Sequence, residues 1–456
     1  MVLLYATYFS VRTVGVHNGL GSSAYDFGLY DQGIWLLSRG HSPFVTLMGR
    51  NLFGDHSSFI LILLVPLYWV VSSTALLFVV QSVVIALGAL PVYWFSRDRL
   101  RSESLAAVFA GIYLIHPSIG WTNLENFHPD AALGTLVAFA VWSAHAKRWG
   151  WYWVVIGLSL AVKEDVAFVL IPLGIWVAFK IDRKRGLLTT VVSIATMLMM
   201  FLVVMRGFTG VAFRNSWRIP FGGVIGLFKT TITQPTKLAS YLWSEDRPAY
   251  VWQMLASVGF VFLIEPSLAA VGAIMLASNV LSTFWYQHQI HYHYSMIIVP
   301  CVVMGSAWAL GRLSRPARRW ASALLIVSSL VCGYLWSPLP LARSKTTSWN
   351  SQTAPVVAAR EAIAFVPGDA VLSAFHSITA QTARRKVIYS FPNPFVRNLY
   401  GPDVFAGGDR LPGADLVEFV VLPKDLDQKA QDVWDAEKDA FRIVHENGWW
   451  VVYQRK

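Results

Sequence analysis

Charged and imidazole side chains that could do chemistry gather in five short motifs of this chain. The motifs are YDFGLYD at 25–31, Gly54-Asp55-His56, His128-Pro129-Asp130, Lys163-Glu164-Asp165 and QHQIHYH at 287–293. A carboxylate in such a motif could act as a general base, carboxylates with imidazoles could hold a divalent metal ion, and an ammonium could bind an anion. Which chemistry is open to the protein depends on which motifs the fold brings together.

The first motif contains two carboxylates, Asp26 and Asp31, where a helical pattern begins. An Asp at a helix start can be an N-cap worth ~1 kcal/mol, so a structural role for Asp26 stands beside a catalytic one. At about 100° per residue, Asp31 points roughly 140° away from Asp26. The two carboxylates are therefore not expected to form a paired acid–base site on one helix face.

Two further motifs combine Asp with His at predicted helix starts. Asp55 and His56 precede an apolar segment, and His128 and Asp130 open a predicted membrane helix with Pro129 in its first turn. Imidazole and carboxylate ligands suit a divalent cation, so these four residues are candidate ligands for Mg or Mn. The alternative is that they cap helices near a membrane surface.

Lys163-Glu164-Asp165 lies between two short apolar segments. Each charge costs about 2.5 to 3.5 kcal/mol at the centre of a membrane helix, so the tripeptide is expected at a turn between two helices. The Lys163 ammonium, with Glu164 beside it, could bind a lipid phosphate as a point charge. The alternative is a turn whose charges neutralise one another.

The histidines of the last motif are spaced by three and then two residues. This spacing fits neither the i, i+4 pair of a zinc helix nor a Cys/His finger. We expect His291 and His293, together with Asp31, to contact a substrate or its phosphate. An interfacial belt of aromatic and imidazole side chains is the alternative.

The elements that position these motifs are predicted to be membrane helices. Of 456 residues, 55% are hydrophobic and 14% charged, and the mean hydropathy is +0.49. This composition excludes a disordered, fibrous or disulfide-rich secreted chain and favours an all-α polytopic membrane protein. Apolar runs predict about eleven spans, at 1–14, 74–96, 104–118, 129–146, 151–162, 166–180, 187–205, 250–264, 266–280, 295–311 and 319–336.

Basic residues of the first 342 positions cluster in four groups near 99, 148, 183 and 315, which is typical of cytoplasmic loops. This threading predicts a cytoplasmic N-terminus and places all five motifs on the outer side. Residues 15–73 and 206–249 are the expected outer loops of a transmembrane domain at 1–342. Topology explains the net charge of +11, so nucleic-acid binding is not expected.

From 343 to 456 the composition is that of a soluble extracytoplasmic α/β domain. Helices are expected at 354–366 and 428–440, and strands at 370–373, 387–390 and 416–422. Two further strands, at 441–445 and 449–453, flank Asn447-Gly448, a dipeptide that favours a tight hairpin turn.

The motifs YDFGLYDQGIW at 25–35, Gly54-Asp-His56, Phe127-His-Pro-Asp130, Lys163-Glu-Asp165 and His293-Tyr294 resemble the bacterial membrane family called domain of unknown function 2079. The resemblance covers nearly the whole chain. That family is similar in turn to GT-C glycosyltransferases, in which an acidic residue of the first outer loop acts at the catalytic centre. By position, Asp26 matches this residue, while His128 and Asp130 match a metal-binding Asp-x-Asp whose first Asp is here His.

The resemblance implies a glycosyltransferase of the bacterial cytoplasmic membrane. It would transfer a sugar from a polyprenyl-phosphate donor to an extracytoplasmic glycan, lipid or protein acceptor, with Asp26 as general base and Lys163 at the phosphate. Two other classes stand beside it: a transporter or lipid flippase, and a non-catalytic scaffold of the cell envelope. The gathering of charge on one side, instead of at the membrane midplane, argues against a transporter.

Overall fold

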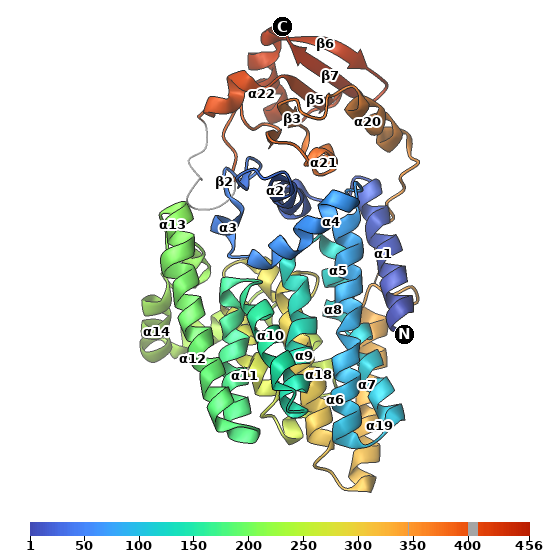
Figure 1. Cartoon of the computed structure of the whole chain (residues 1–456), viewed down its shortest axis with the longest axis vertical. Helices are drawn as coiled ribbons and strands as arrows, with labels where there is room; N and C mark the ends of the chain where they lie inside the picture. The colour runs from blue at the N-terminus through green and yellow to red at the C-terminus, as the bar shows by residue number, and fades with distance from the viewer. Residues whose placement is uncertain (345, 400–408) are drawn as a thin grey trace.

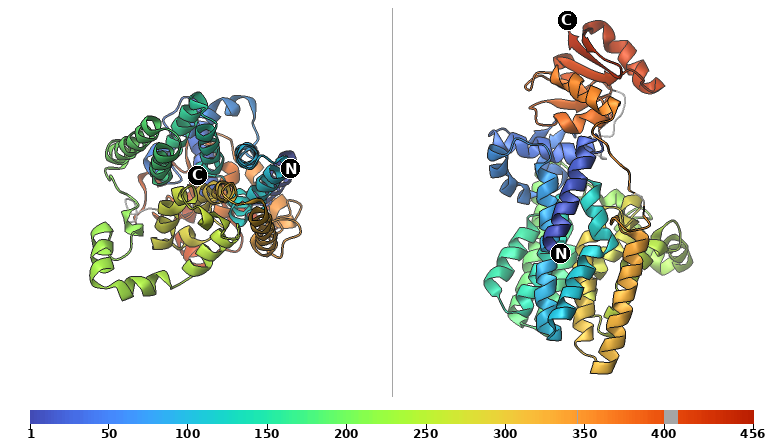
Figure 2. Two further views of the ribbon diagram at one scale, coloured as in Figure 1. Left: turned by 90° about the horizontal axis from the view of Figure 1, so that it is seen from below. Right: turned by 90° about the vertical axis from the view of Figure 1, so that its right-hand side faces the viewer.

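The computed structural model describes residues 1–344, 346–399 and 409–456. A long helical bundle carries a small α/β unit at one end (Figure 1), and the two views of Figure 2 show the same division. We call residues 354–399 and 409–456 the C-terminal unit, and residues 19–75 the first connecting segment. The first connecting segment lies between the bundle and the C-terminal unit (Figure 1).

The helices follow the predicted order along the chain. Those up to the middle of the bundle are α1 (Val2–Asn18), α2 (Leu29–Ser38), α3 (Leu52–Asp55), α4 (Val65–Val70), α5 (Leu76–Leu87), α6 (Ala89–Leu100), α7 (Glu103–Ile115), α8 (Pro117–Glu125), α9 (Leu133–His145), α10 (Trp149–Leu160) and α11 (Ala167–Lys180). The later ones are α12 (Arg183–Met199), α13 (Arg206–Thr209), α14 (Val224–Thr233), α15 (Pro235–Leu242), α16 (Arg247–Ala256), α17 (Ala273–Leu281), α18 (Val299–Leu310), α19 (Arg315–Trp336), α20 (Ala354–Ala364), α21 (His376–Thr379) and α22 (Gln428–Glu437).

Helical segments occur within each of the eleven predicted ranges. In the described part of the chain, four are long and apolar enough to cross a membrane: Leu76–Leu100, Arg183–Thr209, His293–Leu310 and Arg315–Trp336. The pair α7 and α8, bent by 44°, adds a fifth if it forms one span. The other helices are shorter than a membrane-spanning helix usually is, so a multi-pass membrane protein is confirmed while the count of eleven spans is not.

Local sequence explains where several of these helices begin. Ser102 caps α7 by accepting a hydrogen bond from the amide of Leu105, and Asp182 caps α12 by accepting one from Arg185. Such caps satisfy amides that would otherwise have no partner at the helix start. The predicted turn at Lys163 is confirmed, because α10 ends at Leu160 and α11 begins at Ala167.

The C-terminal unit contains a five-stranded sheet in the order β4-β3-β5-β7-β6. Its strands are β3 (Leu372–Ala374), β4 (Ile388–Ser390), β5 (Phe419–Pro423), β6 (Phe441–Glu446) and β7 (Trp450–Arg455), while β1 (Phe44–Val45) and β2 (Arg50–Asn51) form a small hairpin in the first connecting segment. β3 pairs in parallel with β4 and β5, and β7 pairs antiparallel with β5 and β6. The predicted Asn447-Gly448 turn joins β6 to β7, where the Asn447 side chain accepts hydrogen bonds from the amides of Trp449 and Trp450.

One hydrophobic core joins the C-terminal unit to the first connecting segment. It contains Phe27, Ile34 and Leu47 from the segment, packed with side chains such as Ile388 and Val421 from the sheet. Because burial of apolar surface is the main favourable contribution to packing, this shared core holds the two parts against one another. The position of α2 is therefore set partly by residues more than three hundred positions later in the chain.

Candidate functional site

A cavity of about 170 Å³ opens at the end of the bundle nearest the first connecting segment. Its lining comes from the start of α2, the end of α3, the turns before α9 and α11, and the loops before α14 and α18. The lining residues are Tyr25, Asp26, Leu29, Tyr30, Asp55, His56, His128, Asp130, Lys163, Arg218, Phe284, His293 and Tyr294. Four of the five sequence motifs thus supply a charged side chain to one cavity, and the fifth supplies His293.

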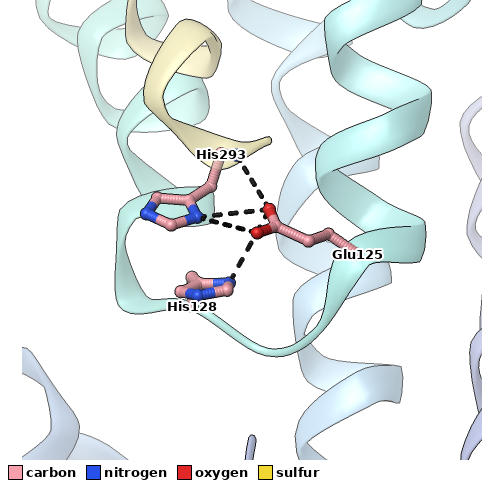
Figure 3. Close-up of side chains that lie close together, drawn as sticks. All are labelled: Glu125, His128 and His293. Atoms are coloured by element: carbon pink, nitrogen blue, oxygen red, sulfur yellow. Dashed lines mark hydrogen bonds and ion pairs between the residues drawn. The ribbon is translucent and has the colours of Figure 1, made fainter. Parts of the chain in front are cut away.

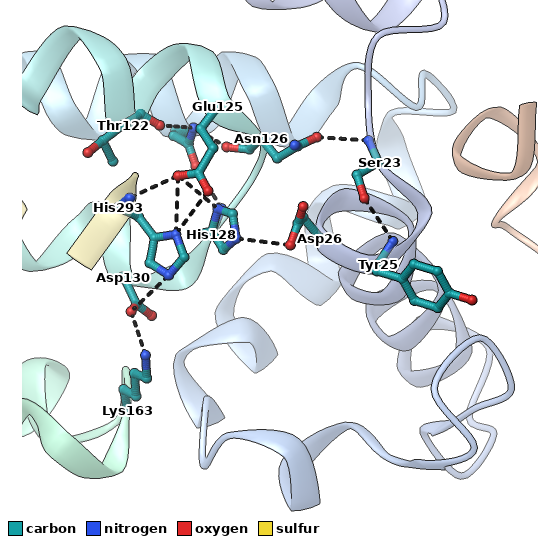
Figure 4. A network of polar contacts seen from close by, with 11 residues as sticks. Ser23, Tyr25, Asp26, Thr122, Glu125, Asn126, His128, Asp130, Lys163 and His293 are labelled. Atoms are coloured by element: carbon teal, nitrogen blue, oxygen red, sulfur yellow. Dashed lines mark hydrogen bonds and ion pairs between the residues drawn. The ribbon is translucent and has the colours of Figure 1, made fainter. Parts of the chain in front are cut away.

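Asp26 lies in a π-helical turn, Ala24–Gly28, that leads directly into α2. Ser23 caps this turn by accepting a hydrogen bond from the amide of Tyr25, so the capping role considered for Asp26 belongs to Ser23. The Asp26 side chain is 42% exposed and lies 3.6 Å from Nε2 of His128 (Figure 4). Burial raises the pKa of Asp26, but interactions with His128, His293 and Ser23 together outweigh this effect and hold the pKa below its usual value. Asp26 is therefore an ionised carboxylate that faces the cavity.

Glu125, His128 and His293 form a compact cluster (Figure 3), which lies beside Asp26 (Figure 4). The imidazole rings of His128 and His293 stack with centroids 3.8 Å apart, and Glu125 Oε2 lies 3.2 Å from Nδ1 of His293 and 4.0 Å from Nδ1 of His128. One ligand atom from each residue lies within 4.8 Å of the others. Ligands around a tetrahedral zinc ion with bonds of about 2.0 Å lie roughly 3.3 Å apart, so the cluster could close around one ion.

Lys163 is fully engaged with carboxylates. Its ammonium donates a hydrogen bond to Asp130 Oδ2 at 2.9 Å (Figure 4). It also lies 3.8 Å from Asp165 Oδ2. Burial lowers the pKa of Lys163, but Asp130 and Asp165 outweigh this and raise it well above its usual value. The same ammonium lies 5.5 Å from the ring centre of Tyr294, within range of a cation–π interaction.

The other residues that the sequence predicted for the site, Glu164, His56 and Asp55, form hydrogen bonds and ion pairs with neighbouring side chains. Glu164 accepts hydrogen bonds from His56 Nδ1 at 2.8 Å and from the amide of Ser57 at 3.1 Å. Asp55 contacts the guanidinium groups of Arg50 at 2.9 Å and Arg214 at 2.5 Å through one oxygen. The four residues predicted as metal ligands thus line one cavity, but only His128 belongs to the compact cluster of possible ligands.

Asp31 and His291 do not line the cavity. Asp31 is fully buried on the opposite face of α2, where it contacts Arg384 and Tyr68. His291 lies against Trp121, with ring centres 4.6 Å apart. The prediction that Asp26 and Asp31 occupy different faces is confirmed, while substrate contact by Asp31 and His291 stays a prediction without support from the cavity lining.

Two charged residues of the site were missed by the motif analysis. Glu125 ends α8 three residues before His128 and lies outside the five motifs. The chain between the two is extended at Asn126, so helical spacing does not predict their contact. Arg218 lines the cavity with its guanidinium carbon 4.4 Å from the ring centre of Phe284 and 6.0 Å from that of Tyr294. Its buried Nε has no hydrogen-bond partner among the described residues. A signal was available, because residues 206–244 contain five Lys or Arg and no Asp or Glu.

A protein-family model matches residues 16–455, nearly the whole chain. The chain belongs to the DUF2079 family of predicted membrane proteins. Among curated proteins, a sequence search finds no match to this DUF2079 chain. The family resemblance inferred from the motifs is therefore confirmed, and other comparisons rest on structure.

The DUF2079 chain is similar in fold to ArnT from Cupriavidus metallidurans. Crystal structures of ArnT bound to undecaprenyl phosphate and in the apo state each match with a TM-score of 0.54 and 13% sequence identity. The match covers 99% of this chain and 97% of the ArnT chain. At this identity the similarity shows the shared fold, because a common scaffold does not by itself confer chemistry.

Proposed function

We propose that this protein is a membrane glycosyltransferase that transfers a sugar from a polyprenyl-phosphate donor to a hydroxyl group of an extracytoplasmic glycan, lipid or protein. The observation that carries the proposal is the cavity, in which an exposed, ionised carboxylate, Asp26, lies together with two cations, Lys163 and Arg218. A carboxylate supplies a base for the acceptor, and cations stabilise a leaving phosphate. The ArnT-like fold supports the same class, since ArnT is described with bound undecaprenyl phosphate.

The reaction would be a direct displacement at the anomeric carbon. An acceptor oxygen forms the new glycosidic bond while the bond between the anomeric carbon and the phosphate oxygen breaks. Asp26 takes the proton of the acceptor hydroxyl, and the electron pair of the broken bond stays on the phosphate. Arg218 would neutralise the charge that grows on this leaving group, and Lys163, whose charge is already balanced by Asp130, would contribute less.

The test is a search for the donor and for transfer from it. Protein purified in mild detergent should carry a polyprenyl phosphate or its sugar conjugate, identified by mass spectrometry of the extracted lipids. Addition of a membrane extract should then release free polyprenyl phosphate in an Asp26-dependent manner. Lipid movement between leaflets without such release would indicate a flippase, and absence of both lipid and release would indicate a scaffold.

We further propose that about eleven helices cross the bacterial cytoplasmic membrane with the C-terminal unit outside. All four basic groups lie at the end of the bundle opposite the C-terminal unit, as expected for cytoplasmic loops (Figure 1). Single cysteines at Arg99 and Arg183 should resist an impermeant thiol reagent in intact cells, whereas cysteines at Ser216 and Asp427 should react. The native Cys301 and Cys332 are buried and give a low background. Equal labelling of both pairs would overturn this orientation.

A divalent metal ion is a further part of the proposal. Mg or Mn was predicted at Asp55, His56, His128 and Asp130, but the cluster of Glu125, His128 and His293 fits an ion better and, with two imidazoles, favours zinc over Mg. The buried Nδ1 atom of His128 has no hydrogen-bond partner among the described residues, which agrees with a role as a metal ligand. When bound, the ion would supply a local positive charge beside Asp26.

Metal content by mass spectrometry tests this site without reference to activity. We expect about one equivalent of zinc in the wild-type protein, a loss of most of it in His293→Asn, and retention in the matched variant His291→Asn, since His291 lies outside the cluster. Equal metal content in the two variants, or none in the wild type, would remove the metal from the proposal.

A further inference from the structure

Arg384 of the C-terminal unit joins three parts of the first connecting segment. Its Nε lies 3.1 Å from each carboxylate oxygen of Asp31 in α2, and its Nη1 and Nη2 donate hydrogen bonds to the carbonyl groups of Ser72 at 2.6 Å and Ser73 at 2.8 Å. The guanidinium carbon also lies 4.4 Å from the ring centre of Tyr68 in α4. The planar, multidentate guanidinium is suited to such bridging in a way that an ammonium is not.

Asp31 is the residue that links this arrangement to the cavity. It is 0% exposed, and it accepts a second short hydrogen bond from the Tyr68 hydroxyl at 2.6 Å. α2 follows the turn that carries Asp26 without interruption. The two carboxylates occupy opposite faces of the same helical stretch, so a rotation of α2 that released Asp31 would move Asp26 relative to the cavity.

We infer that Arg384 is a positioning residue that fixes the orientation of α2 and thereby places the Asp26 carboxylate for the reaction. This inference rests on the proposed function, in which Asp26 is the general base. The C-terminal unit would then contribute to turnover through its contact with Asp31, in addition to any role in binding the acceptor.

Other contacts allow this role to be separated from simple docking of the C-terminal unit. The shared hydrophobic core does not include Arg384, so we expect it to remain when this side chain is removed. Gln32 also donates hydrogen bonds to Thr46 at 2.9 Å and to the carbonyl of Arg385 at 3.3 Å, and Thr46 donates one to the carbonyl of Ile388 at 2.6 Å. Loss of the Arg384 side chain should therefore leave the unit attached while it removes the restraint on the Asp31 face of α2. Among the described residues, the side chains of Gln32 and Ile34 form no hydrogen bond with Asp31 or Arg384 that could replace this restraint.

The experiment separates charge compensation from positioning. Arg384→Met leaves Asp31 buried without its cation, which destabilises the protein whatever the role of the pair. The double variant Asp31→Asn/Arg384→Met removes both charges, and its amide can still accept a hydrogen bond from Tyr68. We expect the double variant to regain most of the wild-type melting temperature, while kcat stays at least tenfold lower and donor affinity changes less than twofold. A misplacement of about 1 Å can cost 100-fold in rate.

Arg360→Met is the matched control. Arg360 also joins the C-terminal unit to the rest of the chain, through a hydrogen bond to the carbonyl of Asn18 at 2.7 Å, but this contact is exposed and does not involve α2. We expect its kcat to stay within twofold of the wild-type value.

Hydrogen exchange of the amides at 24–36 gives a readout that does not depend on activity. Exchange there should be at least tenfold faster in the double variant and unchanged in Arg360→Met. Wild-type exchange, or wild-type kcat, in a folded double variant would overturn the positioning role. If Asp26→Asn retains full turnover, Asp26 is not the general base of the proposed function, and that outcome is visible separately from the exchange result.

Discussion

Asp26→Asn is expected to reduce sugar transfer by about 10²- to 10⁴-fold, because the amide cannot accept the proton of the acceptor hydroxyl. The fold should tolerate the change, since Ser23 and not Asp26 caps the helical turn. The pKa of Asp26 lies below its usual value, because His128 and His293 stabilise the ionised form, so the carboxylate stays ionised at mildly acidic pH. Single-turnover release of polyprenyl phosphate, measured between pH 5 and 8, should therefore show no acidic limb from Asp26.

Asp98→Asn is a suitable control for this variant. The Asp98 side chain is 35% exposed, close to the exposure of Asp26, and it pairs with Arg97 at the end of α6, far from the cavity. The control should retain turnover within twofold and an unchanged melting temperature. If both Asn variants turn over at the wild-type rate, another group must be the base.

Arg218→Met is expected to weaken polyprenyl-phosphate binding by roughly tenfold to 100-fold, which corresponds to the loss of one charge-assisted hydrogen bond of about 1.5 to 3 kcal/mol. Arg218 lines the cavity and has a buried Nε that no described residue satisfies, so its guanidinium is available to a phosphate. Affinity can be measured by titration of the lipid in nanodiscs. Arg206→Met, in the same stretch but exposed and outside the cavity lining, should bind normally.

Lys163 requires a different design, because its ammonium is already paired with Asp130. Lys163→Met alone would leave the buried Asp130 carboxylate without its cation and damage the fold. In the double variant Lys163→Met/Asp130→Asn we expect a smaller loss of affinity than in Arg218→Met, since the removed pair is neutral overall. A larger loss in the double variant would make Lys163 the main phosphate ligand and Arg218 a secondary one.

Local sequence predicted those parts of the protein that depend on neighbouring residues. The Asn447-Gly448 hairpin and the turn at Lys163 follow from backbone preference and from the cost of charge inside a membrane helix. The separation of Asp26 from Asp31 follows from helix geometry. These features needed no information about tertiary contacts.

Features that depend on distant pairing could not be predicted in this way. Nothing near Asp31 in the sequence identifies Arg384 as its partner, so a buried structural carboxylate was interpreted as a substrate ligand. Arg218 belongs to a stretch that has the composition of an interfacial loop, and only its place beside Phe284 in the folded chain assigns it to the cavity. The role of a charged residue depends on its tertiary contacts. The hydrophobic periodicity of a single segment does not predict those contacts.

The core shared by the first connecting segment and the sheet has a consequence for how the protein is made. Phe27, Ile34 and Leu47 leave the ribosome long before Ile388, which completes their packing. At about 5 to 20 residues per second, translation of the intervening chain takes roughly 15 to 70 s. During this interval the first connecting segment of the nascent chain presents apolar side chains without their final partners, and the cavity next to it is incomplete. Newly inserted chains therefore depend on chaperones to protect them against proteases. A premature stop codon before β4 would abolish the site, although every cavity-lining residue had already been synthesised.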